Sequence, residues 1–366
     1  MGVLDRRTVV YRRLVTAPLC CGALLLAAGL AGCGGPQATG GRPGGKPGEQ
    51  PAEQQGSQSL LLVSYSVTKG AYDKILPQFK ADWKRRSGQD LEVKTSYGGS
   101  GSQTRAVIDG LDADLVTLAL PADVLKLQAA GLVQPGWEQE LPNDSTITHS
   151  VLTFLTRAGN PKAIRTWSDL ARPGVAVLTA NPKTSGGARW NFLGLWGSVR
   201  RQGGSDQAAE AFVASVYKNV SNLPKDAREA SDAFLNRGQG DVLLTYENEA
   251  LLGAKQADSK ATAMVVPALN IRIDGPVAVV DRNVDRKGNR KAAEALAAYL
   301  QGEEAQEIFA AEGFRPVNAA VWARRKASFA PVTTLFTAAD LGGWPAIDRT
   351  FFASGGVWDR LAAARR

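Results

Sequence analysis

The sequence predicts an α/β protein, and three observations lead to this fold class. Short apolar runs typical of buried strands lie at residues 60–65, 114–118 and 241–245. Segments with the apolar spacing of helices occur between them, as at residues 72–86 and 207–218. Strands that alternate with helices are typical of parallel βαβ units. The length of 366 residues adds the expectation of two domains.

Each element has its own signal along the chain. Residues 60–65 are apolar except for Ser64, as in a strand covered on both faces, whereas residues 91–95 alternate, as in a strand covered on one face. A glycine-rich loop then precedes a helix expected from Gln103. The same pattern resumes later, with strands expected at 152–155, 175–178, 241–245, 263–266 and 277–280, and helices at 190–200, 207–218 and 291–300.

The composition excludes several kinds of chemistry. With 44% hydrophobic and 21% charged residues, the chain is neither a disordered protein nor a polytopic membrane protein in composition. His149 is the only histidine, and Cys20, Cys21 and Cys33 all lie near the N-terminus. Histidine catalysis and a His/Cys metal site are therefore not expected, and we expect no cofactor. The body should act through backbone amides, hydroxyls and arginines.

Residues 1–32 have the pattern of a lipoprotein-type signal peptide. Four arginines between residues 6 and 13 precede an apolar run that ends at Gly32, directly before Cys33. Leu30-Ala31-Gly32-Cys33 resembles a bacterial lipobox, so we expect cleavage before Cys33 and lipidation of this cysteine. The mature chain would then be anchored outside the cytoplasm. An uncleaved transmembrane anchor is the alternative, and the paired arginines leave export by the Sec or the twin-arginine route open.

Residues 33–57 are predicted to form a Gly/Pro-rich tether, because this segment has too little apolar surface to order itself. A simple export spacer is an equal alternative. The whole chain has a formal net charge of +8, with no run of five basic residues. Nucleic-acid binding is therefore not expected, whereas a small anion is compatible with this charge.

Two glycine-rich loops, at residues 97–102 and 181–187, each lie between an expected strand and an expected helix. Glycine allows a sharp turn and a close approach to a ligand. The first amides of the following helix lack internal acceptors and lie at the positive end of the helix dipole, which favours an anion. Neither loop has the P-loop or Rossmann pattern. The alternative is a tight turn with a serine N-cap in each case.

Four segments carry a resemblance to a known family: residues 98–101 with 106–110, 113–120, 181–191, and 240–244 with 247–252. Through them the chain resembles, from Leu60 to about Asp359, the periplasmic sulfate-binding proteins of sulfate/thiosulfate ABC importers. The resemblance implies a two-lobed periplasmic-binding-protein fold of type II. Each lobe would be a mainly parallel sheet flanked by helices, with the ligand in the cleft between lobes. Lobe 1 would comprise residues 58–140 and 255–320, lobe 2 residues 141–254, and residues 321–366 would form a C-terminal tail docked on the body.

The resemblance also implies which residues bind sulfate. By matching motifs they are Ser66, Ser100, Ser185, Gly186, Gly187, Ala227 and Tyr246. Ser100 and Ser185 would donate through their hydroxyls and Tyr246 through its phenol. The two glycines and Ala227 would donate through backbone N–H groups, as would the segment that holds Ser66. Arg228 and Arg189 would lie behind the binding peptides as positive charges.

Two of these positions depart from the family pattern. Position 66 is usually Asp and is Ser here, and position 246 is usually Trp and is Tyr here. A phenol can also accept a hydrogen bond, so selectivity against protonated anions could loosen. Glu247 and Glu249 lie near Tyr246, and we expect them to pair with arginines or solvent rather than with the ligand.

The expected function is a non-catalytic, monomeric receptor outside the cytoplasm that captures sulfate and delivers it to the membrane subunits of an ABC importer. Thiosulfate, molybdate or another tetrahedral oxyanion is the first alternative. An exported enzyme acting on phosphate or sulfate esters is the alternative of a different class, but no nucleophile with a base lies beside the loops. A ligand-sensing partner of a signalling receptor also stays open.

Overall fold

Two β-sheets organise the part of the chain that this computed structural model describes, residues 58–256 and 262–364. The predictions for the signal peptide, the tether and Cys33 lie outside the described residues. The first sheet has the order β11-β4-β10-β3-β1-β2, with β1 (Gln58–Tyr65), β2 (Leu91–Gly98), β3 (Leu115–Thr117), β4 (Thr146–Ser150), β10 (Ile273–Val279) and β11 (Arg315–Pro316). The second has the order β6-β7-β5-β8, with β5 (Leu152–Arg157), β6 (Val177–Leu178), β7 (Val242–Tyr246) and β8 (Thr262–Val265). A separate pair joins β9 (Leu269–Ile271) to β12 (Thr334–Phe336).

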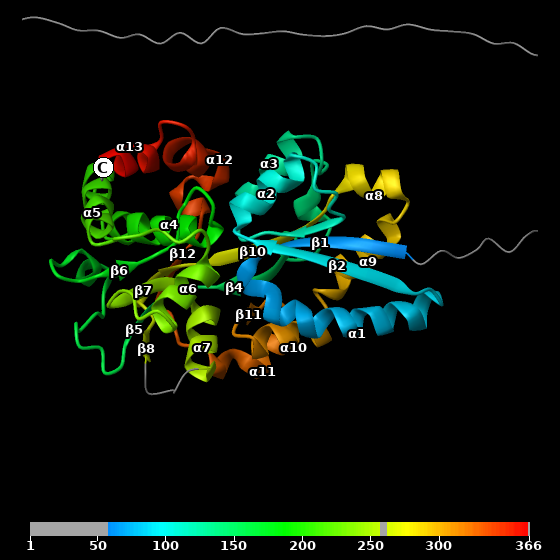
Figure 1. Ribbon diagram of the computed structural model, residues 1–366, viewed down its shortest axis with the longest axis horizontal. Coiled ribbons are helices and arrows are strands. Elements are labelled where there is room, and N and C mark those ends of the chain that lie inside the picture. Colours follow the sequence, from blue (N-terminus) through cyan, green and yellow to red (C-terminus); the bar gives the residue numbers. More distant parts are fainter. Residues whose placement is uncertain (1–57, 257–261, 365–366) are drawn as a thin grey trace, which may run out of the picture. The chain divides into compact units, whose positions relative to one another are not determined.

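Helices flank both sheets, which confirms the predicted α/β class (Figure 1). Those against the first sheet are α1 (Lys69–Ser87), α2 (Ser100–Ile108), α3 (Pro121–Ala129), α8 (Asp281–Lys287), α9 (Arg290–Tyr299), α10 (Glu303–Ala311) and α11 (Ala319–Arg325). Those against the second are α4 (Gly186–Arg200), α5 (Asp206–Lys218), α6 (Ala227–Leu235) and α7 (Glu247–Gln256). The chain ends with α12 (Gly343–Ile347) and α13 (Val357–Ala364). Short turns of helix lie at Ser66–Thr68 (η1), Trp137–Gln139 (η2), Trp167–Ala171 (η3), Lys326–Ser328 (η4), Ala339–Leu341 (η5) and Asp348–Phe352 (η6). We call each sheet with its helices the first lobe and the second lobe.

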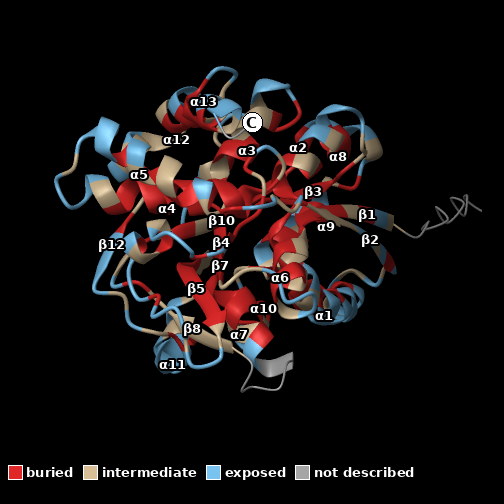
Figure 2. Ribbon diagram, turned by 60° about the vertical axis from the view of Figure 1, so that its left-hand side comes forward, coloured by how far each residue is buried: buried red, intermediate tan, exposed pale blue. Residues whose placement is uncertain are grey.

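Strand β1 shows why the apolar runs become central strands. Its side chains alternate between two covered faces: Leu62 belongs to the core under α1, whereas Val63 belongs to the core under α2 and α3. Because both faces are covered, successive residues from Leu60 to Val63 are all apolar. Helix α1 buries one face against this sheet through residues with helical spacing, among them Tyr72, Ile75 and Phe79. Figure 2 shows its outer face exposed.

The chain crosses between the sheets almost directly. Only Val151 separates β4 in the first sheet from β5 in the second, and only Arg272 separates β9 from β10. Strand β4 leaves the first sheet and β10 returns to it, so the two run antiparallel. These crossings place β4 in the first sheet and β8 in the second, each outside the lobe range that was expected from the sequence.

The sheets differ in one respect from the mainly parallel sheets that were expected, because both are mixed. In the first sheet β1 pairs in parallel with β2 and β3, whereas β10–β3, β10–β4 and β11–β4 are antiparallel. In the second sheet only β6–β7 is parallel. Strand β10 enters the first sheet from the cleft, whereas β3 ends at the cleft. The two therefore run in opposite directions and pair antiparallel.

The C-terminal tail packs on the second lobe through aromatic rings. Trp344 meets Trp190 edge to face at 4.9 Å between ring centroids, and Phe351 meets Trp196 at 4.8 Å. Such edge-to-face pairs are favourable beyond the area that they bury. Trp358 is only 2% exposed, so the tail is part of the core rather than a loose end.

The packing of Phe336 against helix α4 predicts a sensitive position at Gly197. An added Cβ at Gly197 would overlap the Phe336 ring, which is fully buried. We expect Gly197→Ala to lower the free energy of unfolding by about 1–3 kcal/mol, because overpacking displaces a buried ring. Urea denaturation of the purified protein measures this change. The double variant Gly197→Ala/Phe336→Leu should recover part of the loss if the ring is the obstacle, and an unchanged unfolding midpoint for Gly197→Ala would contradict the packing.

Candidate anion-binding site

A small cavity lies where the two lobes meet. The residues that line it come from the ends of strands β1, β2 and β7, from the segment after β3, and from the starts of three helices. They are Tyr65, Ser66, Gly98, Gly99, Ser100, Ala119, Ser185, Gly186, Gly187, Asp226, Ala227 and Tyr246. The fold thus brings together all seven residues that the sequence analysis proposed as ligand contacts.

Three helices begin at this cavity: α2 at Ser100, α4 at Gly186 and α6 at Ala227. Within the described residues, no hydrogen bond leaves the backbone N–H groups of these three residues or of Gly187. A helix N-terminus is equivalent to about half a positive charge, so the three together offer roughly +1.5 without any cationic side chain at the cavity. Such a site favours an anion that accepts hydrogen bonds.

Local sequence explains where two of these helices start. The Ser185 hydroxyl accepts a hydrogen bond from the N–H of Ala188 at 3.3 Å and caps α4. The Asp226 carboxylate accepts from the N–H of Glu229 at 2.9 Å, and the Glu229 side chain accepts from the N–H of Lys225 at 2.8 Å. This reciprocal arrangement is close to a capping box.

The glycines of the two loops are required by close approach. A Cβ at Gly99 of the first lobe would lie 2.5 Å from the carbonyl oxygen of Thr184 in the second. A Cβ at Gly186 would lie 2.5 Å from the Cβ of Ala119, again across the lobes. Gly99 and Gly186 both have negative φ, so the sharp turn that we considered from the sequence is not the reason for glycine here.

Hydrogen bonds also join the lobes around the cavity. The indole N–H of Trp190 donates to the carbonyl oxygen of Ala119 at 2.7 Å, and a guanidinium N–H of Arg105 donates to that of Lys183 at 3.0 Å. These bonds hold the lobes together over the cavity, so the structure is a closed form.

Ser100 has a different hydroxyl partner from the one expected. Its Oγ donates to Asp123 Oδ2 at 2.7 Å and accepts from the N–H of Ala119 at 3.0 Å. A carboxylate is a strong acceptor, so the hydroxyl proton is taken inside the first lobe. The backbone N–H of Ser100 is the donor left for the cavity.

Arg189 extends this network to the second lobe. Its Nη1 lies 2.6 Å from Asp123 Oδ1, and its Nε donates to the carbonyl oxygen of Pro182 at 3.0 Å. Asp123 is fully buried and Arg189 is 6% exposed. The arginine therefore lies behind the binding loops, as expected, but paired with a carboxylate of the other lobe.

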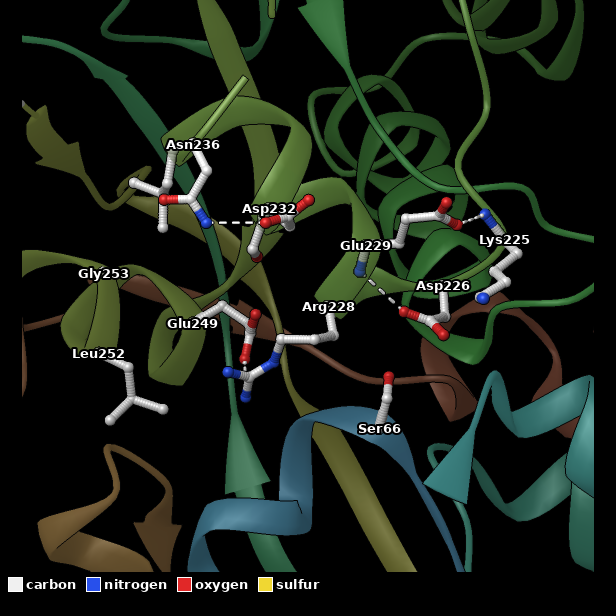
Figure 3. A pocket seen from close by; sticks show the side chains of 12 residues that line it. Ser66, Lys225, Asp226, Arg228, Glu229, Asp232, Asn236, Glu249, Leu252 and Gly253 are labelled. Carbon is white, nitrogen blue, oxygen red and sulfur yellow. Dashed lines mark hydrogen bonds and ion pairs between the residues drawn. The ribbon is translucent and has the colours of Figure 1, made fainter. Parts of the chain in front are cut away.

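Glu247 and Glu249, which follow Tyr246 closely in the sequence, each pair with an arginine. Arg228 Nη2 is 2.8 Å from Glu249 Oε1, as Figure 3 shows, and Arg315 holds Glu247 at 2.6 Å. The expectation that both glutamates pair with arginines is confirmed. Burial raises the pKa of Glu249, and the charge of Arg228 opposes this shift.

Tyr246 ends β7 with its phenol at the cavity. The side chain is 2% exposed, and within the described residues its Oη has no hydrogen-bond partner. Burial raises the pKa of Tyr246 well above its ordinary value, so the phenol keeps its proton. Its ring lies close over Gly187, where an added Cβ would be 2.8 Å from Cε2. A buried donor without a partner is then ready for a ligand oxygen.

Two carboxylates of the site were missed by the sequence analysis. Asp123 follows Pro121 in the first turn of α3, and Asp226 directly precedes Ala227. The Asp226-x-x-Glu229 spacing is a signal for a helix start that could have been recognised. What it would not have shown is that this helix starts at the same cavity as the two glycine loops.

None of the helices in residues 58–256 and 262–364 has the length and apolar character needed to span a bilayer. Among the same residues, no three or more His, Cys, Asp or Glu side chains gather in a way that could hold a metal ion.

Comparison with known proteins extends these observations. A family model described as bacterial extracellular solute-binding protein matches residues 60–315. The sulfate-binding protein of a Synechocystis species is 52% identical over 84% of this chain and 87% of its own length. The thiosulfate-binding protein of Pseudomonas aeruginosa is 39% identical over 83% of this chain and 92% of its own length.

A solved structure has the same architecture. The sulfate-binding protein SubI from Mycobacterium tuberculosis H37Rv superimposes with a TM-score of 0.74 and is 38% identical, covering 81% of this chain and 99% of that one. The fold is thus the type II periplasmic-binding-protein fold that the family resemblance implied. On this evidence the chain belongs to the family of bacterial extracellular solute-binding proteins.

Proposed function

We propose that this protein captures sulfate between its two lobes, outside the cytoplasm, and delivers it to the membrane subunits of an ABC importer. The convergence of three helix N-termini on one closed cavity carries this proposal. The names of the sulfate-binding relatives support the choice of anion.

Hydrogen bonding at the cavity is strong enough for useful affinity. Roughly seven hydrogen bonds to a charged oxyanion, at about 1.5–3 kcal/mol each, give a gross gain on the order of 10–20 kcal/mol. Micromolar binding needs only about 8 kcal/mol net. The difference between this gross gain and the net binding free energy offsets the cost of desolvating the anion and of closing the lobes.

The place and state of the protein in the cell are part of the proposal. Cleavage before Cys33 and lipidation of this cysteine would anchor the chain to the membrane, with residues 33–57 as tether. We propose a monomeric, non-catalytic receptor, in keeping with a family named for solute binding. Thiosulfate is the second candidate ligand, because a relative named for thiosulfate binding is 39% identical over most of both chains.

Calorimetric titration of the purified protein, stripped of bound anions, tests the ligand. We expect one-to-one binding of sulfate, and competition with thiosulfate and molybdate then ranks these anions. Ser185→Asp should weaken sulfate binding at least about 100-fold, because it puts a negative charge beside the amides of Gly186 and Gly187. Aspartate also caps helices well, so the fold should persist.

A matched control for this variant is Ser205→Asp. Ser205 caps α5 through its hydroxyl, as Ser185 caps α4, but it does not line the cavity. Its sulfate affinity should equal that of the wild type. Undiminished binding by Ser185→Asp would remove this loop from the site, and absence of binding to any oxyanion by the wild type would refute the proposed function.

Lobe closure should fail in Gly99→Ala. The added methyl would meet the carbonyl oxygens of Thr184 at 2.5 Å and Lys225 at 3.1 Å across the lobes. We expect weaker sulfate binding and, in small-angle scattering, no decrease of the radius of gyration at saturating sulfate. Gly70→Ala serves as control, since its nearest neighbour is the flexible end of Glu312 within the first lobe. Sulfate-induced compaction of Gly99→Ala equal to that of the wild type would contradict the mechanism.

A further inference from the structure

Asp226 introduces a carboxylate into a cavity that otherwise offers hydrogen-bond donors. The residue lines the same cavity as the helix N-termini and is 6% exposed. Its Oδ1 accepts the N–H of Glu229, and no hydrogen bond reaches its Oδ2 within the described residues. Figure 3 draws a neighbouring pocket that Asp226 and Ser66 also line, and it shows the two side chains near each other, with one oxygen of Asp226 joined to Glu229.

The charge of Asp226 has no cationic partner in the described part of the chain. Arg228, two residues further on, is held by Glu249. The positive end of the α6 dipole, which Asp226 caps, is the remaining group that offsets its negative charge. A fully ionised oxyanion in the cavity would therefore meet an unpaired negative charge at this wall.

Tyr246 adds a second group that can accept. Its Oη is buried without a partner and lies near Gly187, where an added Cβ would be 3.1 Å from it. A phenol oxygen can accept a hydrogen bond as well as donate one, whereas the indole of a tryptophan can only donate. Two walls of the cavity can thus accept a hydrogen bond from an O–H group of a ligand.

From these two groups we infer that the cavity also binds a tetrahedral oxyanion that carries one proton, such as monohydrogen phosphate. This inference rests on the proposed anion-binding function and deepens it. In a cavity of donors alone, the O–H of such an anion would be buried without an acceptor, and its own hydrogen bond to water would be lost. Here Asp226 accepts a hydrogen bond from that O–H. A charge-assisted hydrogen bond then replaces the repulsion that a fully ionised anion would meet at this carboxylate.

Calorimetric titration with sodium phosphate and sodium sulfate tests the inference. At about pH 8, above the second pKa of a phosphate group, phosphate is mainly the monohydrogen dianion. We expect the wild type to bind both anions. Asp226→Asn and Tyr246→Trp should each lower the ratio of phosphate affinity to sulfate affinity by about 10- to 100-fold, the effect of leaving one buried donor without an acceptor.

The variants are chosen so that the fold stays intact. Asparagine caps a helix as well as aspartate does, so Asp226→Asn keeps the start of α6. Asp232→Asn is the matched control: it removes the same charge from the same helix, but Asp232 pairs with Arg237 on the surface and does not line the anion cavity. Its affinities for both anions should be those of the wild type.

The outcomes separate this inference from the proposed function. Sulfate binding with phosphate binding more than about 1,000-fold weaker in the wild type would overturn the inference and leave the sulfate receptor standing. Equal changes in the affinities for both anions in Asp226→Asn would show that Asp226 does not distinguish the protonated anion and would also overturn it. Failure of the wild type to bind either anion would refute the proposed function itself.

Discussion

A backbone N–H at the start of a helix has no acceptor within that helix, and in this protein three such starts meet at one cavity. One of them belongs to the first lobe and two belong to the second, so the cavity exists only while the lobes are together. The glycines at positions 99 and 186 allow this approach, since any side chain there would meet the opposite lobe. Charge attraction for the ligand and contact between the lobes therefore depend on the same few backbone atoms.

The buried pair of Asp123 and Arg189 places formal charges of both signs between the lobes. A buried ion pair contributes little net stability, because the loss of hydration offsets much of the attraction. Separation of the partners would expose both charges to water again, so the pair does little to keep the lobes shut. It does give closure a defined geometry, since Asp123 also orients the Ser100 hydroxyl and Arg189 also holds the carbonyl oxygen of Pro182.

Local patterns in the sequence were enough for the α/β class, for the apolar strands such as β1 and for helices such as α5. Motif matching was enough to name seven residues that line one cavity. The antiparallel pairing of β10 was not predictable in this way, because it depends on where the chain crosses between sheets. Nor were the roles of Asp123 and Asp226, since each carboxylate reaches the site only through contacts between segments far apart in sequence.

The order of strands in the first sheet has a consequence for how the protein is made. Strand β10 lies between β3 and β4, although it follows both by more than a hundred residues, and the tail supplies rings that cover α4. While the chain emerges from the ribosome, the sheet therefore has a gap at its centre and the second lobe an uncovered aromatic face. Such non-local pairing makes folding slow. Assembly of the first sheet must therefore wait until β10 has been synthesised, and the rings that cover α4 follow only later.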